Sequence, residues 1–355
     1  MRIVAIVQAR MGSTRLPGKV MKKVCDVPIL EILLNRLRLS KKIDQIVVAT
    51  SDDPKNSVIK NHLLEIGFKY SIGSERDVLS RVFHAASEAK ADIVVRITGD
   101  CPFVDWVLVD NVITNFQEQG VDYCSNISPA TFPDGLDVEV FSFSSLLNAH
   151  KNATSLYDRE HVTPFIRNNE NCKKFNITND PDLSKLRWTL DEQEDFNVIK
   201  NIFEYFQPNL YFTWLDVLNL YKEKPELFNE NIKISRNEGA IMGQGQKLWK
   251  RAKQVIPGGN MLLSKRSEMF LPDQWPSYFS KSKGCTVWDM DGVAYTDMSI
   301  MGIGTNILGY GHPEVDEAVQ NAIQDGNMST LNAPEEVYLA EKLIDLHPWA
   351  EMARF

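Results

Sequence analysis

A glycine-rich loop that carries three basic residues stands near the start of the chain. The segment QARMGSTRLPGK, residues 8–19, directly follows the apolar run Ile3–Val7. Its glycines allow main-chain N–H groups to close around phosphate oxygens, and Arg10, Arg15 and Lys19 supply positive charge that can offset a polyphosphate. The spacing lacks the Walker pattern of a P-loop. We therefore expect a loop that holds a nucleoside triphosphate.

The elements that must position this loop follow an alternating pattern. Three short runs are almost wholly apolar and β-branched, as strands buried on both faces are: Ile3–Val7, Gln45–Ala49 and Ile93–Ile97. Helical patterns at 29–37, 57–66 and 78–89 lie between and after them. This alternation predicts right-handed βαβ units, a mostly parallel sheet and an α/β fold. Ligands bind beyond the carboxyl ends of such strands, where both the loop and Thr98-Gly99-Asp100 fall.

Composition narrows the class of protein. A length of 355 residues with 43% hydrophobic content favours two domains. Lys and Arg number 39 against 47 Asp and Glu, and the net charge of −8 argues against nucleic-acid or anionic-membrane binding through net charge. The five cysteines are scattered, and neither a signal-peptide pattern nor a membrane-spanning apolar stretch is present. We expect a soluble, cytoplasmic protein.

A change of composition after the aromatic helical segment predicts a domain boundary. The expected division is a first domain at 1–225, a linker at 226–240 and a second region at 241–355. The second region shows a helical pattern around 245–255 and a hairpin-like segment at 286–295. The sequence Asp289-Met290-Asp291-Gly292 could begin a calcium loop, but the twelfth loop position lacks glutamate, so a hairpin is expected.

Five ordered motifs carry a family resemblance over residues 1–220: QARMGSTRLPGK, TGDCP, FPDGLDVEVF, REHVTPFIR and RWTLDEQEDF. Together they resemble the cytidylyltransferases of the spore-coat polysaccharide F type, which are related to the CMP-sialate and CMP-Kdo synthetases. The resemblance implies a glycosyltransferase-A-like nucleotidyltransferase fold. It also implies Mg²⁺-dependent transfer of CMP from CTP to a sugar acid, sugar phosphate or related surface-polysaccharide precursor, with release of pyrophosphate.

The resemblance also implies roles for individual residues in the nucleotide site. The residues expected to bind the nucleotide are Ala9, Arg10, Met11, Gly12, Ser13, Arg15, Lys19 and Asp100, with Arg10, Lys19 and Asp100 also catalytic. Asp100 and Asp191 are the expected Mg²⁺ ligands, because this ion keeps several waters and takes one or two carboxylates beside phosphate oxygens. The alternatives are a Gly-Asp turn for Asp100, solvated charges for Arg10 and Lys19, and a capping box formed by Asp191 and Glu194 at a helix start, after a strand-like 186–190.

Two further groups could contact the acceptor. Asp137 and Glu139 alternate on an expected strand after a turn and could point into an acceptor pocket, although a solvated strand face would show the same pattern. Arg159, with Glu160 and His161, could orient a carboxylate or phosphate of the acceptor. A surface helix is the alternative for this second group.

The second region resembles the N-terminal part of class III aminotransferases, especially the glutamate-1-semialdehyde aminomutase group. The matching segments are Pro257-Gly258-Gly259, GCTVWDMDG at 284–292, LGYGHP at 308–313 and LAEKL at 339–343. In that family a Ser-Gly-Thr phosphate loop and a Schiff-base lysine would follow, beyond residue 355. We therefore expect pyridoxal phosphate (PLP) and aminotransferase activity only in a longer, bifunctional parent, and a surface role for Lys342.

Two other functions stay open from the sequence. A glycosyltransferase of the A fold would hold nucleotide and metal at the same edge of the sheet, and pyrophosphate release would distinguish nucleotidyl transfer from it. An inactive binding or assembly module, with the aminotransferase-like region forming a homodimer, would bind no CTP. The expected partners are CTP and a small sugar-like acceptor.

Overall fold

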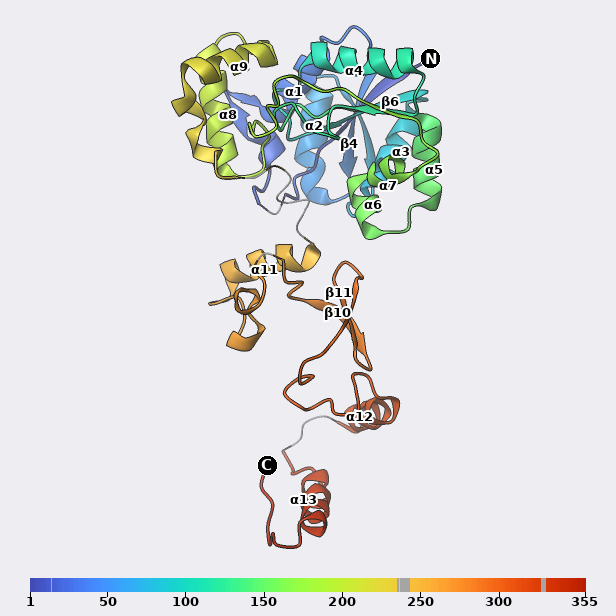
Figure 1. The fold of residues 1–355 in the computed structure, drawn as a ribbon, viewed down its shortest axis with the longest axis vertical. Coiled ribbons are helices and arrows are strands. Elements are labelled where there is room, and N and C mark those ends of the chain that lie inside the picture. Colours follow the sequence, from blue (N-terminus) through green and yellow to red (C-terminus); the bar gives the residue numbers. More distant parts are fainter. Residues whose placement is uncertain (14, 235, 237–242, 273, 327–329) are drawn as a thin grey trace. The chain divides into compact units, whose positions relative to one another are not determined.

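The computed structural model describes residues 1–13, 15–234, 236, 243–272, 274–326 and 330–355 (Figure 1). Within residues 1–241, seven strands form one sheet in the order β5-β4-β1-β6-β8-β7-β9. Their bounds are β1 Ile3–Gln8, β4 Gln45–Ser51, β5 Lys69–Gly73, β6 Ile93–Thr98, β7 Tyr123–Ser125, β8 Glu139–Ser142 and β9 Lys174–Asn176. All pairings are parallel except those of β8, which runs opposite to its two neighbours. The predicted α/β fold with a mostly parallel sheet is confirmed.

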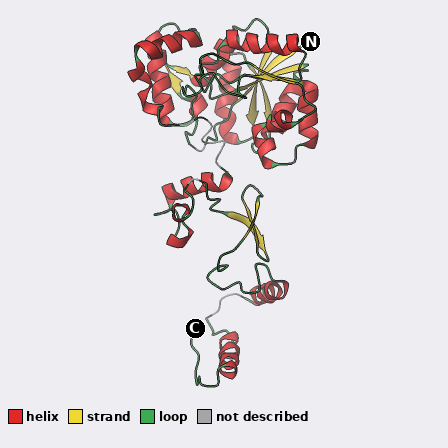
Figure 2. Ribbon diagram, in the orientation of Figure 1, coloured by secondary structure: helices red, strands yellow, loops and turns green. Residues whose placement is uncertain are grey.

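Helices cover both faces of this sheet (Figure 2). They are α1 Ile29–Leu37, α2 Ser57–Glu65, α3 Val78–Glu88, α4 Trp106–Gln119, α5 Phe143–Asn152, α6 Leu156–His161, α7 Pro164–Asn168, α8 Gln193–Phe206 and α9 Trp214–Glu223. Short 3-10 helices lie at η1 Lys19–Met21, η2 Pro54–Asn56 and η3 Pro225–Asn231, and β2 Lys23–Val24 pairs with β3 Val27–Pro28. The predicted strands at 3–7, 45–49 and 93–97 and the predicted helices at 29–37, 57–66 and 78–89 are confirmed as β1, β4, β6, α1, α2 and α3.

The central strand β1 explains why the sheet is buried on both faces. Ile3, Ala5 and Val7 enter one apolar core together with α1, α4 and α8, whereas Val4 and Ile6 enter a second core with α3 and α5. Each buried Ile or Val side chain contributes about 1.5–3 kcal/mol through loss of contact with water. The near-continuous apolar run therefore specifies a central strand that carries its loop to a fixed place at the sheet edge.

Polar side chains fix where the helices begin. Asp77 accepts a hydrogen bond from the Ser80 amide at 2.9 Å at the start of α3. Asp105 accepts from the Val107 and Leu108 amides, each at 2.9 Å, at the start of α4. These carboxylates satisfy amides that the first helical turn leaves without a partner, and they set the ends of the loops at the sheet edge.

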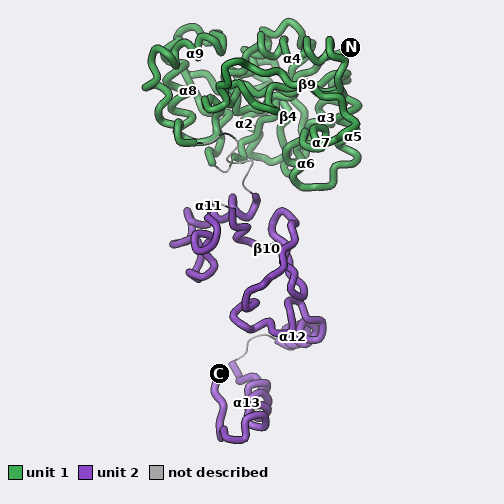
Figure 3. The backbone as a smooth tube through the Cα atoms, in the orientation of Figure 1, with its two compact units in different colours: residues 1–241 green, residues 242–355 purple. Residues whose placement is uncertain are grey.

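The chain divides into two compact units, residues 1–241 and 242–355 (Figure 3). The expected linker at 226–240 differs from this division, because η3 packs against α8 and buries Asn231 within the first unit. Residues 235 and 237–240 of that linker lie outside the described residues. The first unit therefore extends beyond residue 225.

The described residues of the second unit form a three-stranded antiparallel sheet and five helical segments. Its elements are α11 Gln244–Val255, η4 Leu263–Lys265, η5 Ser267–Met269, β10 Phe279–Lys283, β11 Thr286–Asp289, β12 Ala294–Thr296, α12 Pro313–Asp325 and α13 Glu335–Leu346. The predicted hairpin is confirmed by the pairing of β11 with β12, and Asp289 accepts the amides of Asp291 and Val293 in its turn. Lys342 lies on α13, a helix without a buried residue.

No helix in the part of the chain that the structure describes is long and apolar enough to cross a lipid bilayer.

Candidate functional site

The loop after β1 folds back on itself. The Gly18 amide donates to the Met11 carbonyl at 3.0 Å, and the Met11 amide donates to Asn56 Oδ1 at 2.7 Å. Gly18 has a φ of +69°, a left-handed conformation that suits glycine, and it precedes Lys19 at the start of η1. Thr14 of this loop lies outside the described residues. The hydrogen bond between Gly18 and Met11 thus holds the two ends of the loop together and fixes the backbone from which the Lys19 side chain projects.

Lys19 joins the two carboxylates that the sequence singles out as metal ligands. Its Nζ atom lies 2.7 Å from Asp100 Oδ2 and 2.8 Å from Asp191 Oδ1. Arg15 Nη2 contacts the same Asp191 oxygen at 2.9 Å. The structure therefore brings together Arg15, Lys19, Asp100 and Asp191 from three distant parts of the sequence.

The charges in this cluster stabilise one another against the cost of burial. Burial alone would lower the pKa of Lys19, but the Asp100 and Asp191 carboxylates outweigh it and raise that pKa. Burial alone would raise the pKa of Asp191, but Lys19 and Arg15 hold it at about 2. Lys19 is therefore a cation and Asp191 an anion at neutral pH.

Main-chain hydrogen bonds set the distance between the two carboxylates. The Leu190 amide donates to the Asp100 carbonyl at 2.8 Å, and the Thr189 hydroxyl donates to the same oxygen at 3.2 Å. The Gly99 amide donates to the Gln8 carbonyl at 2.8 Å, which ties Asp100 to the end of β1. The predicted strand at 186–190 is wrong, because these residues form no strand and make one isolated bridge, between Arg187 and Asp134.

The predicted capping box of Asp191 and Glu194 is also wrong by one residue. Helix α8 begins at Gln193, and its capping box joins Glu192 to Asp195. Asp195 Oδ2 accepts the amides of both Asp191 and Glu192 at 2.9 Å. Asp191 therefore stands before the cap, and its side chain is available to Lys19 and Arg15.

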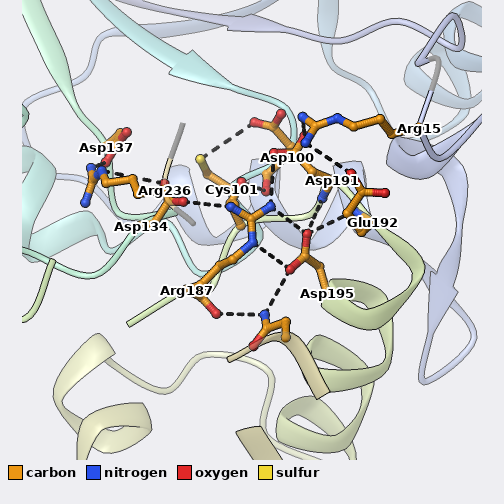
Figure 4. Close-up of polar contacts among 12 residues, drawn as sticks. Arg15, Asp100, Cys101, Asp134, Asp137, Arg187, Asp191, Glu192, Asp195 and Arg236 are labelled. Carbon is orange, nitrogen blue, oxygen red and sulfur yellow. Dashed lines mark hydrogen bonds and ion pairs between the residues drawn. The ribbon is translucent and has the colours of Figure 1, made fainter. Parts of the chain in front are cut away.

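Arg187 lies beneath the cluster and contacts three carboxylates (Figure 4). It makes a two-point contact with Asp195, with Nε to Oδ1 at 2.9 Å and Nη2 to Oδ2 at 2.8 Å. It also donates to Asp134 Oδ2 at 3.0 Å and to Asp191 Oδ2 at 3.3 Å. Because the Arg187 side chain is only 5% exposed, these contacts replace water almost completely.

A second arginine covers the acidic side of this network. Arg236 pairs with Asp137 and donates to the Phe132 carbonyl at 2.9 Å, and its Nε lies 3.9 Å from Asp134 Oδ1. Burial raises the pKa of Asp137, against the opposing effect of Arg236. Burial and the Asp137 carboxylate raise the pKa of Asp134 to about 7, against the opposing effect of Arg236 and Arg187.

Arg10 and Glu139 have partners outside this network. Arg10 Nη1 donates to Glu75 Oε1 at 2.7 Å, so Arg10 is paired and not a free solvated charge. The solvated strand face is wrong for Glu139, which is 3% exposed and pairs with Arg96 on the adjacent strand β6. Burial disfavours the charged form of Glu139, but Arg96 together with hydrogen bonds from Thr163 and Tyr123 keeps its pKa below the usual value.

The Arg159 group lies on α6, a helix without a buried residue. Arg159 Nε donates to Asp77 Oδ2 at 3.0 Å, and Nη1 donates to the His150 carbonyl at 2.8 Å. The His161 ring lies against that of Tyr157 on the same helix. Asp77 caps α3, so the contacts of Arg159 connect it to that helix start and not to Lys19.

Comparisons with known proteins identify the family of the first unit. The family described as Cytidylyltransferase matches residues 4–234. The chain belongs to the cytidylyltransferase family. An uncharacterized protein of Methanocaldococcus jannaschii is 40% identical over 209 residues, which cover 58% of this chain and 85% of that protein. The spore coat polysaccharide biosynthesis protein SpsF of Bacillus subtilis is 36% identical over 211 residues, covering 57% and 86% respectively.

A solved structure shows the same fold for this cytidylyltransferase region. The cytidylyltransferase of Leptospira borgpetersenii aligns with a TM-score of 0.62 and 34% identity, over 64% of this chain and 97% of that one. The first unit is accordingly a nucleotidyltransferase of the α/β class.

The second region matches a different family. The family described as Aminotransferase class-III matches residues 272–355. A glutamate-1-semialdehyde 2,1-aminomutase of an Anaeromyxobacter species is 34% identical over 110 residues, which cover 31% of this chain but 25% of that enzyme. The chain thus spans about a quarter of the length of this aminomutase relative.

The donor set of the cytidylyltransferase unit suits a hard divalent cation. Asp100 and Asp191 each direct one oxygen at the same ammonium group, so both oxygens already face a shared positive charge. Among the described residues no group of three or more His, Cys, Asp and Glu is arranged to hold a metal. Two carboxylates suffice for Mg²⁺ when phosphate oxygens and waters complete its shell.

Two other features of the first unit, a buried thiol and a surface hollow, are weaker candidates for a reactive group and a ligand site. Burial raises the pKa of the Cys101 thiol well above its ordinary range, so the thiol beside Asp100 is neutral and a poor nucleophile. A surface hollow of about 230 Å³ lies near Arg38, Asp44 and Lys69, at the amino ends of β4 and β5. In parallel sheets, ligands bind beyond the carboxyl ends of the strands. This is the opposite edge of the sheet, where Lys19 lies.

The sequence interpretation missed several residues of the network. Arg187, Glu192 and Asp195 lie within the quoted motif RWTLDEQEDF, and Asp134 lies within FPDGLDVEVF, so motif membership was the available signal. Arg236 and Asn231 lie outside all five motifs, and their roles depend on contacts across more than 30 residues.

Gly135 allows the loop that carries Asp134 to lie against Trp188 and Thr189. Its φ is +102°, and a Cβ atom there would lie 2.6 Å from the Trp188 carbonyl carbon and 2.7 Å from the Thr189 nitrogen. We expect Gly135→Ala to loosen this segment and speed hydrogen exchange of the Trp188 and Leu190 amides. Gly120→Ala is the matched control, because Gly120 also has a positive φ but no atom near its Cβ position. Equal exchange in the two variants would contradict this interpretation.

The Asp134 carboxyl makes the first unit less stable as pH rises. Its folded pKa of about 7 exceeds the ordinary value of 3.8, so between these values the folded state holds a proton that the unfolded state has lost. The stabilising contribution of Asp134 is complete below the unfolded-state pKa of 3.8. It is lost as the pH rises through the folded-state pKa of about 7. We expect Asp134→Asn to abolish this component of the pH dependence, as measured by hydrogen exchange of β6 amides corrected for intrinsic rates. A stability difference between Asp134→Asn and wild type that stays constant with pH would refute this role of Asp134.

Proposed function

We propose that the first unit transfers CMP from CTP to a small sugar-like acceptor, with Mg²⁺ as cofactor and pyrophosphate as the second product. The observation that carries the proposal is the ammonium group of Lys19, within 2.8 Å of both Asp100 and Asp191 and directly after the glycine-rich loop. Membership of the cytidylyltransferase family supports the choice of CTP.

Each residue of the cluster has a task in this reaction. An acceptor oxygen, either an anionic oxygen or a hydroxyl that gives its proton to solvent, attacks the α-phosphorus, the bond to the bridging oxygen breaks, and pyrophosphate leaves with the electron pair. Lys19, Arg15 and Arg10 would neutralise negative charge on the triphosphate, since transfer of this kind depends mainly on positioning and charge stabilisation. Asp100 and Asp191 would hold Mg²⁺, which supplies Lewis-acid stabilisation of phosphate oxygens.

The acceptor belongs to the precursors of a surface polysaccharide in this proposal. Support comes from SpsF of Bacillus subtilis, whose name places it in spore coat polysaccharide biosynthesis. The aminotransferase-like region further favours an acceptor that carries an amino group, with transamination and PLP supplied by a longer, bifunctional parent. Asp137, Glu139, Arg159 and His161 stay the candidate acceptor contacts, and Asp137 shares the partner Arg236 with Asp134.

Pyrophosphate release tests the proposed reaction. The assay combines Mg²⁺ and each nucleoside triphosphate with sugar acids, sugar phosphates and small phosphorylated alcohols, including matched amino and hydroxyl forms. We expect release that requires both CTP and an acceptor and that Asp100→Ala abolishes. Consumption of a nucleotide sugar without pyrophosphate would indicate glycosyl transfer instead, and absence of CTP binding would indicate a binding or assembly module.

Removal of the Lys19 ammonium has opposite effects on the two ligands. A charge-assisted hydrogen bond contributes about 1.5–3 kcal/mol, so Lys19→Ala should lower CTP affinity or rate roughly 10- to 100-fold. The same change should raise Mn²⁺ affinity without nucleotide, because an ammonium and a divalent cation at the same carboxylates repel each other. Lys22→Ala is the control, since Lys22 contacts Gln193 instead. Unchanged CTP affinity and rate in Lys19→Ala would count against the assignment.

A further inference from the structure

We infer that Arg187 is a positioning residue for the metal site: it fixes the Asp191 carboxylate so that one oxygen faces Asp100. This inference rests on the proposed function, which assigns Asp100 and Asp191 to Mg²⁺. It adds a residue that touches neither nucleotide nor metal in the proposed reaction and acts through Asp191.

The contacts of Asp191 divide between its two oxygens. Oδ2 accepts from Arg187 Nη2 at 3.3 Å, on the buried side. Oδ1 faces Lys19 at 2.8 Å and Arg15 at 2.9 Å, on the side of Asp100. The Arg187 contact therefore selects the rotation of the carboxylate, and with it the oxygen that is presented to a shared cation.

The same guanidinium also holds the main chain of Asp191. Arg187 makes its two-point contact with Asp195, and Asp195 Oδ2 in turn accepts the amides of Asp191 and Glu192. Asn231 braces this pair, because its Nδ2 donates to Asp195 Oδ1 at 2.9 Å and to the Arg187 carbonyl at 3.0 Å. Both the backbone and the side chain of Asp191 thus depend on one buried fork.

Only the planar guanidinium group of an arginine, whose N–H groups point in several directions, can make these contacts together. A lysine at position 187 would keep the positive charge but would present one ammonium group to carboxylates that lie in three directions. Mutation of a residue that hydrogen-bonds to a metal ligand and orients it typically lowers metal affinity by about 10- to 100-fold. We expect a loss of this size in Arg187→Lys.

A role through charge alone predicts the opposite sign for a neutral variant. If Arg187 acted only as a nearby positive charge, it would repel a metal ion, and Arg187→Gln would bind the ion more tightly. A positioning role predicts weaker binding in Arg187→Gln as well. The direction of the change in this variant therefore separates the two explanations without any measurement of activity.

Mn²⁺ binding to the full chain, followed by electron paramagnetic resonance of the free ion with and without CTP, is the experiment. Arg36→Lys is the matched control, because Arg36 is also a buried arginine but donates to the main-chain carbonyls of Val104 and Leu210. Weaker binding in both Arg187 variants, with wild-type affinity in Arg36→Lys, supports the inference. Wild-type affinity in Arg187→Lys, tighter binding in Arg187→Gln, or an equal loss in the control overturns it.

Two additional variants keep the test decisive. Asp191→Asn shows whether the site binds the ion at all: wild-type affinity in this variant would contradict the proposed metal site itself and not only the role of Arg187. If the Arg187 variants do not fold, Asp195→Asn removes one carboxylate oxygen from the same fork while leaving Arg187 in place. Wild-type Mn²⁺ affinity in folded Asp195→Asn would then overturn the inference.

Discussion

Buried negative charge at the carboxyl edge of the sheet is the constraint on which the site depends. Asp100, Asp134, Asp191 and Asp195 lie close together and are largely removed from water. Carboxylates in such a place need cationic partners, because an unpaired buried charge is strongly destabilising. Lysine and arginine side chains from three separate segments of the chain provide these partners: Arg15 and Lys19 from the glycine-rich loop, Arg187, and Arg236. Charge balance thus joins distant parts of the sequence into one site.

Local patterns were sufficient to predict the framework of this site. The apolar runs around Val4, Val47 and Val94 became adjacent parallel strands, and the rule for their carboxyl ends placed the glycine-rich loop beside Asp100. The start of α8 was harder, because Asp191 with Glu194 and Glu192 with Asp195 have the same spacing. Arg187 binds Asp195, a contact that favours the second pair and that no local pattern reveals.

Long-range side-chain contacts account for the other differences between prediction and structure. Glu139 alternates with neighbours as a solvated strand residue would, yet β8 pairs with β6 and places it opposite Arg96. Arg236 lies a few residues after η3 and reaches Asp137 across 99 sequence positions. Pairings of this kind depend on the completed sheet and not on the residues nearby in sequence.

The two units differ in how completely they bury apolar side chains. Strand β1 has five core residues that are 5% exposed or less. On α12, by contrast, Val315, Val319 and Ile323 share one helix face and are 47%, 52% and 57% exposed. The first unit therefore provides the packing that positions Lys19 and both carboxylates, within residues 1–241.

The most direct test of the account is a crystal structure of the chain with CTP and Mn²⁺, in which anomalous scattering locates the metal. We expect one Mn²⁺ peak in contact with Asp100 and Asp191, with the triphosphate along residues 9–19 and the Lys19 ammonium turned toward phosphate oxygens. A nucleotide bound elsewhere, or a metal held without either carboxylate, would contradict it.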